Sequence, residues 1–329
     1  YFDCSSGICG DMILAAFIDL GIDPNMINDA IAGLNIAEKP RVVWSKISRN
    51  ITGTTATVEF DRNNAPSKRG FKEICTLLKS SKLKSPVIEN SIEVFKVIGE
   101  AEAAIHGVPL NEIHFHEIGA VDSISDIVGA AWCFDHLACK KVCFSKIPIG
   151  TGTIETAHGK LPLPAPAAAA ILKDIPVYGV DVSNEIVTPT GAAIAKVFAD
   201  EFAEFPSMQT ESIGYGFAKN SLPSLPGVLR IFKGSSADLK ESDTVFIVET
   251  NIDNYNPEFF AHLFALLFKE KALDVSITSI LMKKGRPGHK LSVICNTENL
   301  DGISDCILQN TSSIGLRYLK AGRKKLLRE

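Results

Sequence analysis

The pattern of apolar and polar positions over the first 240 residues predicts an α/β region. A short strand at residues 1–4 leads through a loop of small residues into an amphipathic helix. Residues 41–60 alternate apolar and polar side chains over β-branched stretches, which predicts a hairpin that turns near Asn50 and Gly53. Residues 85–106 repeat apolar side chains at helical spacing, which predicts a long amphipathic helix.

The middle of this region predicts a parallel sheet. A strand at 113–117, a helix at 126–137 and a strand at 141–148 have the order and spacing of a β-α-β unit. After a proline-rich stretch and an alanine-rich helix, Thr188-Pro189-Thr190-Gly191 precedes a further helix predicted at 192–202. A polar segment at 235–243 has no apolar period, and we interpret it as a linker.

The rest of the chain predicts a smaller α+β domain. Strands and helices follow in the order βαββαβ, at residues 244–251, 257–272, 273–282, 290–296, 300–309 and 314–319. That order is typical of the ferredoxin-like fold. We therefore predict two domains, a larger α/β region at residues 1–240 and a ferredoxin-like domain at residues 241–329.

The composition is that of an ordinary globular protein. Of the 329 residues, 46% are hydrophobic and 22% are charged, and the length suits two domains. The net charge of −4 supplies no overall positive field toward nucleic acid or an anionic membrane. No apolar run approaches the roughly 18 residues that a membrane span needs, and no signal peptide is recognisable. Eight cysteines without a C-x-x-C pair favour reduced thiols. We therefore expect a cytoplasmic protein.

The segment from His114 to Asp126 is the richest in potential metal ligands. His114 and His116 are two residues apart in a predicted strand and so share a face, and Glu117 follows them. Imidazole and carboxylate groups together suit a borderline metal such as nickel or zinc. Asp122 and Asp126 are four residues apart, which places both on one face of a helix start. The alternative is structural, with Asp122 as a helix cap and the histidines bonded at a sheet margin.

Two loops that follow strands are candidates for substrate binding. Asp3 ends the first strand and Asp11 opens the following helix, where backbone N–H groups could cradle a phosphate beside a metal on Asp3. His158 ends a glycine-bearing loop and is a candidate metal ligand or acid/base. The helix start at Thr188 is a possible anion site by the same reasoning, although capping explains it equally well. A structural role stays open for each.

The second domain combines acidic and basic side chains near strand ends. Glu249, Asn251 and Asp253 alternate along a strand end, so their oxygen atoms share a face that suits Mg or Mn carrying phosphates. A local excess of cations favours a polyphosphate site over a solvated face. These cations are Lys283, Lys284, Arg286 and Arg317.

Taken together, these segments resemble the LarC family, the nickel insertion proteins of nickel-pincer cofactor biosynthesis. The matching motifs are Phe2-Asp3, Gly10-Asp11-Met12, His114-Phe115-His116-Glu117, Val121-Asp122, His158-Gly159, Thr188-Pro189-Thr190-Gly191, Glu249-Thr250-Asn251-Ile252-Asp253 and Met282-Lys283-Lys284. The resemblance implies a lyase-class cyclometallase that inserts Ni(II) into pyridinium-3,5-bisthiocarboxylic acid mononucleotide. One Ni–C and two Ni–S bonds form, and CTP is consumed in the presence of Mn or Mg.

The resemblance also implies roles for individual residues. The amino-terminal region would handle nickel and the carboxy-terminal region would bind metal–CTP. The implied nickel ligands are His114, His116, Glu117 and Asp122, with Asp3, Asp11 and His158 as catalytic residues. The implied CTP site has Glu249 and Asp253 on its metal, and Lys283, Lys284, Arg286 and Arg317 on its phosphates.

The implied partners are the small-molecule nucleotide substrate, the sulfur-insertion enzyme of the same pathway and the recipient racemase. An open ferredoxin-like sheet also favours a homo-oligomer. Two other classes stay open: a non-catalytic nickel metallochaperone, and a metal-dependent phosphohydrolase or nucleotidyltransferase.

The chain departs from the family pattern at two places. Asp253-Asn254 stands where the family has two consecutive aspartates, and Thr311-Ser312-Ser313 stands where a threonine run is usual. The chain starts at Tyr1 directly before strand-like residues and stops in a charged segment. We therefore expect a longer natural protein, with the second domain truncated here.

Overall fold

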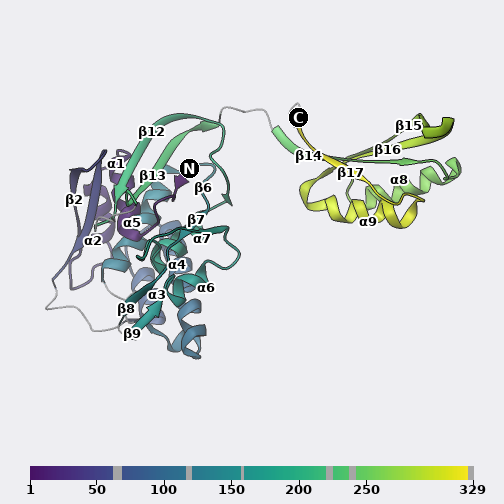
Figure 1. Ribbon diagram of the computed structural model, residues 1–329. Helices are drawn as coiled ribbons and strands as arrows, with labels where there is room; N and C mark the ends of the chain where they lie inside the picture. The colour runs from purple at the N-terminus through teal and green to yellow at the C-terminus, as the bar shows by residue number, and fades with distance from the viewer. Residues whose placement is uncertain (62–68, 116–120, 157–158, 220–224, 237–241, 325–329) are drawn as a thin grey trace. The chain divides into compact units, whose positions relative to one another are not determined.

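The computed structural model describes residues 1–61, 69–115, 121–156, 159–219, 225–236 and 242–324 (Figure 1). The chain divides into two units, unit 1 at residues 1–236 and unit 2 at residues 237–329. Each unit has its own hydrophobic core.

The main sheet of unit 1 is mixed. Among the described residues its strand order is β11 (Glu201–Phe202), β6 (Cys143–Phe144), β1 (Phe2–Asp3), β13 (Val228–Ser236), β12 (Met208–Phe217), β3 (Thr52–Glu59) and β2 (Arg41–Ser48). β1 is parallel to β6 and antiparallel to β13, and β2 and β3 form the predicted hairpin. The prediction of a parallel sheet is wrong because the antiparallel β12–β13 pair lies between β1 and β3.

The remaining strands of unit 1 form small separate sheets. They pair as β4 (Arg69–Gly70) with β5 (His114–Phe115), β7 (Ile147–Ile149) with β10 (Val177–Gly179), and β8 (Thr153–Thr156) with β9 (Gly159–Pro162). The predicted β-α-β unit is therefore wrong, since β5 pairs with β4 and the strand predicted at 141–148 divides into β6 and β7. Ser145 marks the division: its N–H donates to the Phe2 carbonyl (2.9 Å) and its hydroxyl accepts from the Cys4 N–H (2.9 Å).

The helices of unit 1 pack against this sheet and against one another. They are α1 (Gly10–Asp19), α2 (Pro24–Ala32), α3 (Phe71–Lys79), α4 (Ser85–His106), α5 (Val121–Leu137), α6 (Pro166–Ile171) and α7 (Pro189–Phe198), with a short 3-10 helix at Leu110–Glu112. α5 begins five residues before its predicted start because Val121 and Ile124 continue its apolar period into the core. α7 covers 189–198 instead of 192–202, since residues 201–202 form β11. None of the helices among the described residues is long and apolar enough to cross a bilayer.

α1 packs very closely on β12 because two glycines of that strand face it. A Cβ atom at Gly214 would lie 2.1 Å from the Ala16 carbonyl oxygen, and one at Gly216 would lie 2.0 Å from the Met12 carbonyl oxygen. Any side chain at these positions would push the helix away from the sheet. The two glycines therefore fix the height of α1 above the sheet, and with it the position of the first turn of α1.

Unit 2 has the predicted ferredoxin-like arrangement. Its antiparallel sheet has the order β15 (Asp274–Met282), β16 (Arg286–Asn296), β14 (Ser242–Ile252) and β17 (Arg317–Lys324), with α8 (Phe260–Lys269) and α9 (Leu300–Asn310). Val248, Leu263, Leu291 and Ile303 are fully buried between sheet and helices. The expected fold class, a larger α/β region with a ferredoxin-like domain after it, is confirmed.

Candidate functional site

The first turns of α1 and α7 lie side by side in unit 1. Ile8 and Val187 form a parallel bridge just before the two helices. The Ile8 N–H donates to the Ile186 carbonyl (2.8 Å), and the Thr188 N–H donates to the Ile8 carbonyl (3.2 Å). A Cβ atom at Gly191 would lie 2.3 Å from the Ile8 carbonyl oxygen, so this approach requires glycine. Two helix N-termini are therefore brought together from distant parts of the chain.

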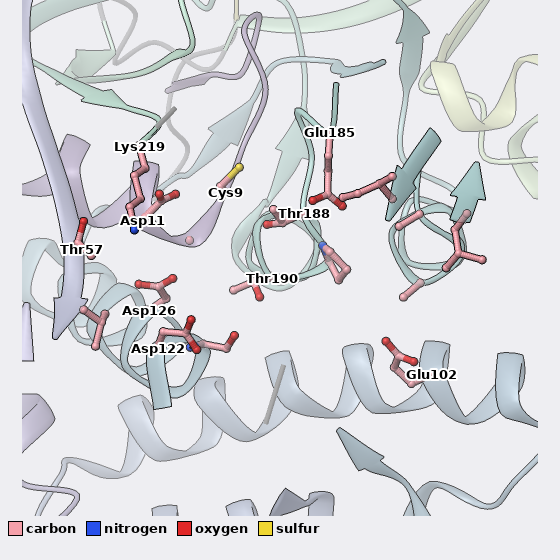
Figure 2. A pocket seen from close by; sticks show the side chains of 18 of the residues that line it. Cys9, Asp11, Thr57, Glu102, Asp122, Asp126, Glu185, Thr188, Thr190 and Lys219 are labelled. Atoms are coloured by element: carbon pink, nitrogen blue, oxygen red, sulfur yellow. The ribbon is translucent and has the colours of Figure 1, made fainter. Parts of the chain in front are cut away.

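A cavity of about 1000 Å³ lies at these two helix starts, and Figure 2 shows its polar side chains. Its size suits a nucleotide-sized ligand. Residues from α1, β3, α4, α5, β8, β9, α6 and α7 line it. The polar lining residues include Cys9, Asp11, Thr57, Glu59, Glu102, His106, Asp122, Ser123, Asp126, Glu155, Glu185, Thr188, Thr190 and Lys219.

Three of the carboxylates interact with one another. Asp122 and Asp126 lie one turn apart on α5, and Asp11 stands on the first turn of α1. Gly10 makes room for Asp126, since a Cβ atom there would lie 2.5 Å from its Oδ2. Burial, and then the charges of Asp11 and Asp122, raise the pKa of Asp126 well above its usual range. Burial also raises the pKa of Asp11, against the opposing charge of Lys219. The part of the cavity formed by Asp11, Asp122 and Asp126 therefore favours binding of a proton or of a cationic ligand.

Asp126→Asn is expected to raise the free energy of unfolding at pH 7 by on the order of 1 kcal/mol. Because the folded protein holds this proton more tightly than the unfolded chain, the wild type loses stability as pH rises from about 4, the ordinary Asp pKa, through the raised pKa of Asp126. The asparagine carries no such titration. Urea unfolding at several pH values between 4 and 8 measures the difference, which should vanish below pH ~4.

Asp181→Asn, at an exposed position of unit 1, is the matched control and should change the free energy of unfolding at pH 7 by no more than about 0.5 kcal/mol. A constant stability difference between wild type and Asp126→Asn across the whole pH range would contradict the raised pKa.

Among the described residues, only some of the site residues predicted in unit 1 line the cavity. Asp11 and Asp122 line the cavity. Asp3 does not: its Oδ2 pairs with Arg230 (2.9 Å to Nε) and its Oδ1 accepts from the Ser5 N–H (3.0 Å). Burial alone would raise the pKa of Asp3. The hydrogen bonds from Ser5 and Arg230 outweigh this effect and leave the pKa of Asp3 below its usual value. Asp3 thus joins β1 to β13 through an ion pair.

The remaining predictions in unit 1 concern histidines and one glutamate. His116, Glu117 and His158 lie outside the described residues. For His114 only the backbone is described, and it pairs with Gly70 in the β4–β5 sheet. The nickel ligand set predicted from the sequence therefore stays a prediction.

The site proposed from the sequence left out two residues of the cavity, Asp126 and Lys219. Asp126 had a local signal, since its spacing of four from Asp122 places both on one helix face. Lys219 had none: it follows β12 by two residues and reaches Asp11 only because β12 packs beneath α1. Figure 2 shows the Lys219 side chain beside Asp11.

Unit 2 contains a second cavity, of about 590 Å³. It lies at the end of β14, next to the loop that precedes β17. Its polar lining residues are Glu249, Thr250, Asn251, Asp253, Ser312, Ser313 and Arg317. The side-chain oxygen atoms of Asn251 and Asp253 and the predicted cation Arg317 therefore line the same cavity.

Glu249 is committed to ion pairs. Its Oε1 lies 2.9 Å from Lys290 Nζ, and its Oε2 lies 3.0 Å from an Arg317 guanidinium nitrogen. Hydrogen bonding, first from Lys290 and then from Arg317, holds the pKa of Glu249 below its usual range. The sequence suggested a metal ligand here, but the structure makes Glu249 the anchor of two cations. Lys290 was missed because it lies on the neighbouring strand.

The other predicted cations of unit 2 lie at the start of β16 and in the turn before it. Arg286 is 3.7 Å from the Asp253 carboxylate, an exposed pair of small energetic weight. Lys283 and Lys284 stand in the turn between β15 and β16 and are not among the residues that line the cavity. Asp253 and Asn251 present hard oxygen donors of the kind that Mg and Mn prefer. The donor set thus fits a metal–nucleotide.

The loop before β17 is tied to β14. The Thr250 hydroxyl donates to the Gly315 carbonyl (2.9 Å) and also bonds the Ser313 hydroxyl. The Ser312 hydroxyl donates to the Asn254 carbonyl (2.9 Å). Hydroxyls that replace the usual threonine run therefore hold the loop at the cavity. In neither unit do three or more His, Cys, Asp or Glu side chains of the described part of the chain gather as a group that could hold a metal ion.

Comparison with known proteins gives one consistent description. A family model described as "Nickel insertion protein" matches residues 1–329. A protein named for nickel insertion from Desulfotalea psychrophila is 40% identical over 329 residues, which are 100% of this chain and 84% of that protein. One of the same name from Citrifermentans bemidjiense is 41% identical over 324 residues, 98% of this chain and 84% of that protein.

Among solved structures, there is a match to LarC2, titled as the C-terminal domain of a cyclometallase involved in the synthesis of the NPN cofactor of lactate racemase. The identity is 38%, and the match covers 25% of this chain and 57% of that chain with a TM-score of 0.25.

Proposed function

The chain belongs to the nickel insertion protein family, as the resemblance in its motifs predicted, and from that premise we propose that it is a CTP-dependent nickel cyclometallase. Its substrate would be pyridinium-3,5-bisthiocarboxylic acid mononucleotide, into which it inserts Ni(II) for the nickel-pincer cofactor of lactate racemase-type enzymes. Nickel is a substrate in this reaction. It stays Ni(II) while one Ni–C and two Ni–S bonds form, and the ring carbon that binds nickel releases one proton.

The observation that carries the proposal is the pair of chemically different cavities. The larger one, in unit 1, is rich in carboxylates and is large enough for a nucleotide. The smaller one, in unit 2, combines an anchored arginine with strand-end oxygen atoms. Two such cavities suit a reaction that joins a metal ion to one nucleotide and consumes another.

In unit 2 we assign the CTP site. Arg317, held by Glu249, would bind the phosphates. Arg286, at the start of β16, and Lys283 and Lys284, in the turn before it, are proposed as further phosphate ligands. Asp253 and Asn251 would hold Mn or Mg, which neutralises phosphate charge when it is bound.

In unit 1 we assign the nickel and pyridinium nucleotide site. Asp11 and Asp122 line the cavity beside Asp126, whose raised pKa allows it to hold a proton in the folded protein. His114, His116, Glu117 and His158 remain proposed from the sequence as nickel ligands and acid/base. Asp3 is left out of the catalytic set because its carboxylate is paired with Arg230.

A single-turnover assay of the natural full-length protein with CTP, Mn, Ni(II) and the bisthiocarboxylate substrate tests the function. We expect a nickel-dependent absorption band that requires CTP. Tight nickel binding with no CTP requirement would identify a metallochaperone instead. CTP turnover without the substrate, insensitive to nickel, would identify a phosphohydrolase or nucleotidyltransferase. Either outcome contradicts the proposal.

A further inference from the structure

We propose that Thr190, between the first turns of α1 and α7, binds the phosphate of a pyridinium mononucleotide in the cavity of unit 1, with the cationic ring against the carboxylates of α1 and α5. The inference rests on the proposed function, since it gives the substrate an orientation in that cavity.

The first observation is the hydroxyl of Thr190. This residue is only 7% exposed, yet it lines the cavity. Within the part of the chain that the structure describes, its side chain has no hydrogen-bond partner, in contrast to Thr188, whose hydroxyl accepts from the Gly191 N–H (3.2 Å). The Thr190 oxygen is not among the fully buried unpartnered side-chain atoms of the described residues, so it is open to the cavity, where it can bond an oxygen atom of a ligand. Figure 2 shows Thr190 at the cavity, beneath Thr188.

The second observation is the backbone around Thr190. α1 and α7 are each 10 residues long, and their N-terminal ends are locked together through Ile8. Both therefore direct the positive ends of their dipoles toward the same region. Pro189 occupies the first position of α7 and has no N–H, and Thr188 binds the Gly191 N–H. The N–H of Thr190 is thus the first donor of α7 that a ligand could use, on the same residue as the unpaired hydroxyl.

The third observation is the charge of the other walls. Lys219 adds a cation at the cavity, but Asp11, Asp122, Asp126 and Glu185 also line it. These carboxylates disfavour a simple anion such as inorganic phosphate. They suit a ligand that carries a positive ring together with its phosphate, because the charge of the ring offsets the repulsion between the carboxylates and the phosphate. A pyridinium mononucleotide has this distribution of charge.

Titration calorimetry with nicotinic acid mononucleotide and with the corresponding riboside, which lacks the phosphate, tests the subsite on the full chain. The wild type should bind the mononucleotide more tightly. Thr190→Val keeps the shape and removes the hydroxyl, so it should weaken mononucleotide binding about tenfold and leave riboside binding unchanged. Thr52→Val, at an exposed position of β3 that does not line the cavity, is the matched control and should change neither affinity.

Three results would overturn the subsite: no mononucleotide binding by the wild type, equal affinity for mononucleotide and riboside, or equal effects of the two valine variants. Thermal unfolding shows whether Thr190→Val is folded. If it is not, Thr190→Ser, which keeps the hydroxyl, should bind as the wild type does, and Thr190→Ala, which removes it without adding bulk, should lose affinity for the mononucleotide alone. The opposite pattern would again overturn the proposal.

Nickel insertion is measured separately on the same proteins. If the protein binds the mononucleotide more tightly than the riboside but inserts no nickel, the proposed function is wrong and the phosphate subsite still holds. If it inserts nickel but binds the two ligands equally, the phosphate subsite is wrong and the proposed function still holds.

Discussion

Arg317→Ala is expected to weaken binding of CTP with Mn about 10- to 100-fold, because hydrogen bonds to charged groups contribute about 1.5–3 kcal/mol. The arginine lines the cavity of unit 2, and its guanidinium is oriented by Glu249 at 3.0 Å. Its side chain is 55% exposed, so its loss should leave the fold nearly unaffected. Calorimetric titration with Mn-CTP measures the effect.

Two further variants distinguish binding of the CTP phosphates by Arg317 from a general effect of the protein's net charge. Lys320→Ala removes an exposed cation of the same strand that does not line the cavity, and it should bind Mn-CTP as the wild type does. Glu249→Gln removes the anchor but keeps the arginine, so it should lose only a few-fold in affinity. Equal losses in Lys320→Ala and Arg317→Ala would show that net charge alone attracts the nucleotide.

His114→Ala combined with His116→Ala is expected to lower nickel binding at least 100-fold and to abolish nickel insertion, since both imidazoles are proposed as nickel ligands. CTP binding should be unchanged, because the proposed nucleotide site belongs to unit 2. Equilibrium dialysis with Ni(II) and titration with Mn-CTP give the two readouts.

His106→Ala is the matched control for the histidine pair. His106 lines the cavity of unit 1, and its Nε2 lies 3.5 Å from Glu102 one helical turn away. We expect its loss to leave nickel affinity within a few-fold of the wild type. If the control loses as much affinity as the double variant, or if the double variant keeps its nickel, the proposed ligand set is incorrect.

Sequence reasoning worked best where one local pattern decides the outcome. The βαββαβ order of unit 2 was predicted correctly because each element carries its own period and turn signals. The hairpin at 41–60 was predicted for the same reason. Asp11, Asp122, Asp253 and Arg317 were singled out from strand ends and helix starts, and all four line one of the two cavities.

The pairing of the two-residue strands was not predicted correctly from the sequence. β5 was expected to join the main sheet, but it pairs with β4, and the residues between them in the chain include α3 and α4. A strand of two residues has too few side chains to show which sheet it enters. The role of Glu249 was misread for a related reason, because its partner Lys290 lies 41 positions away along the chain.

By itself, the sequence determined the family, the ferredoxin-like order of unit 2 and the residue types that could serve nickel and CTP, since motifs and periodicity are local properties. Only the tertiary structure decided which of these residues meet. It placed Lys219 beside Asp11, tied Asp3 to Arg230 and Glu249 to Lys290, and joined the starts of α1 and α7 around Thr190. Spacing along a chain tells which face a side chain occupies, whereas its neighbours across space depend on how distant elements pack.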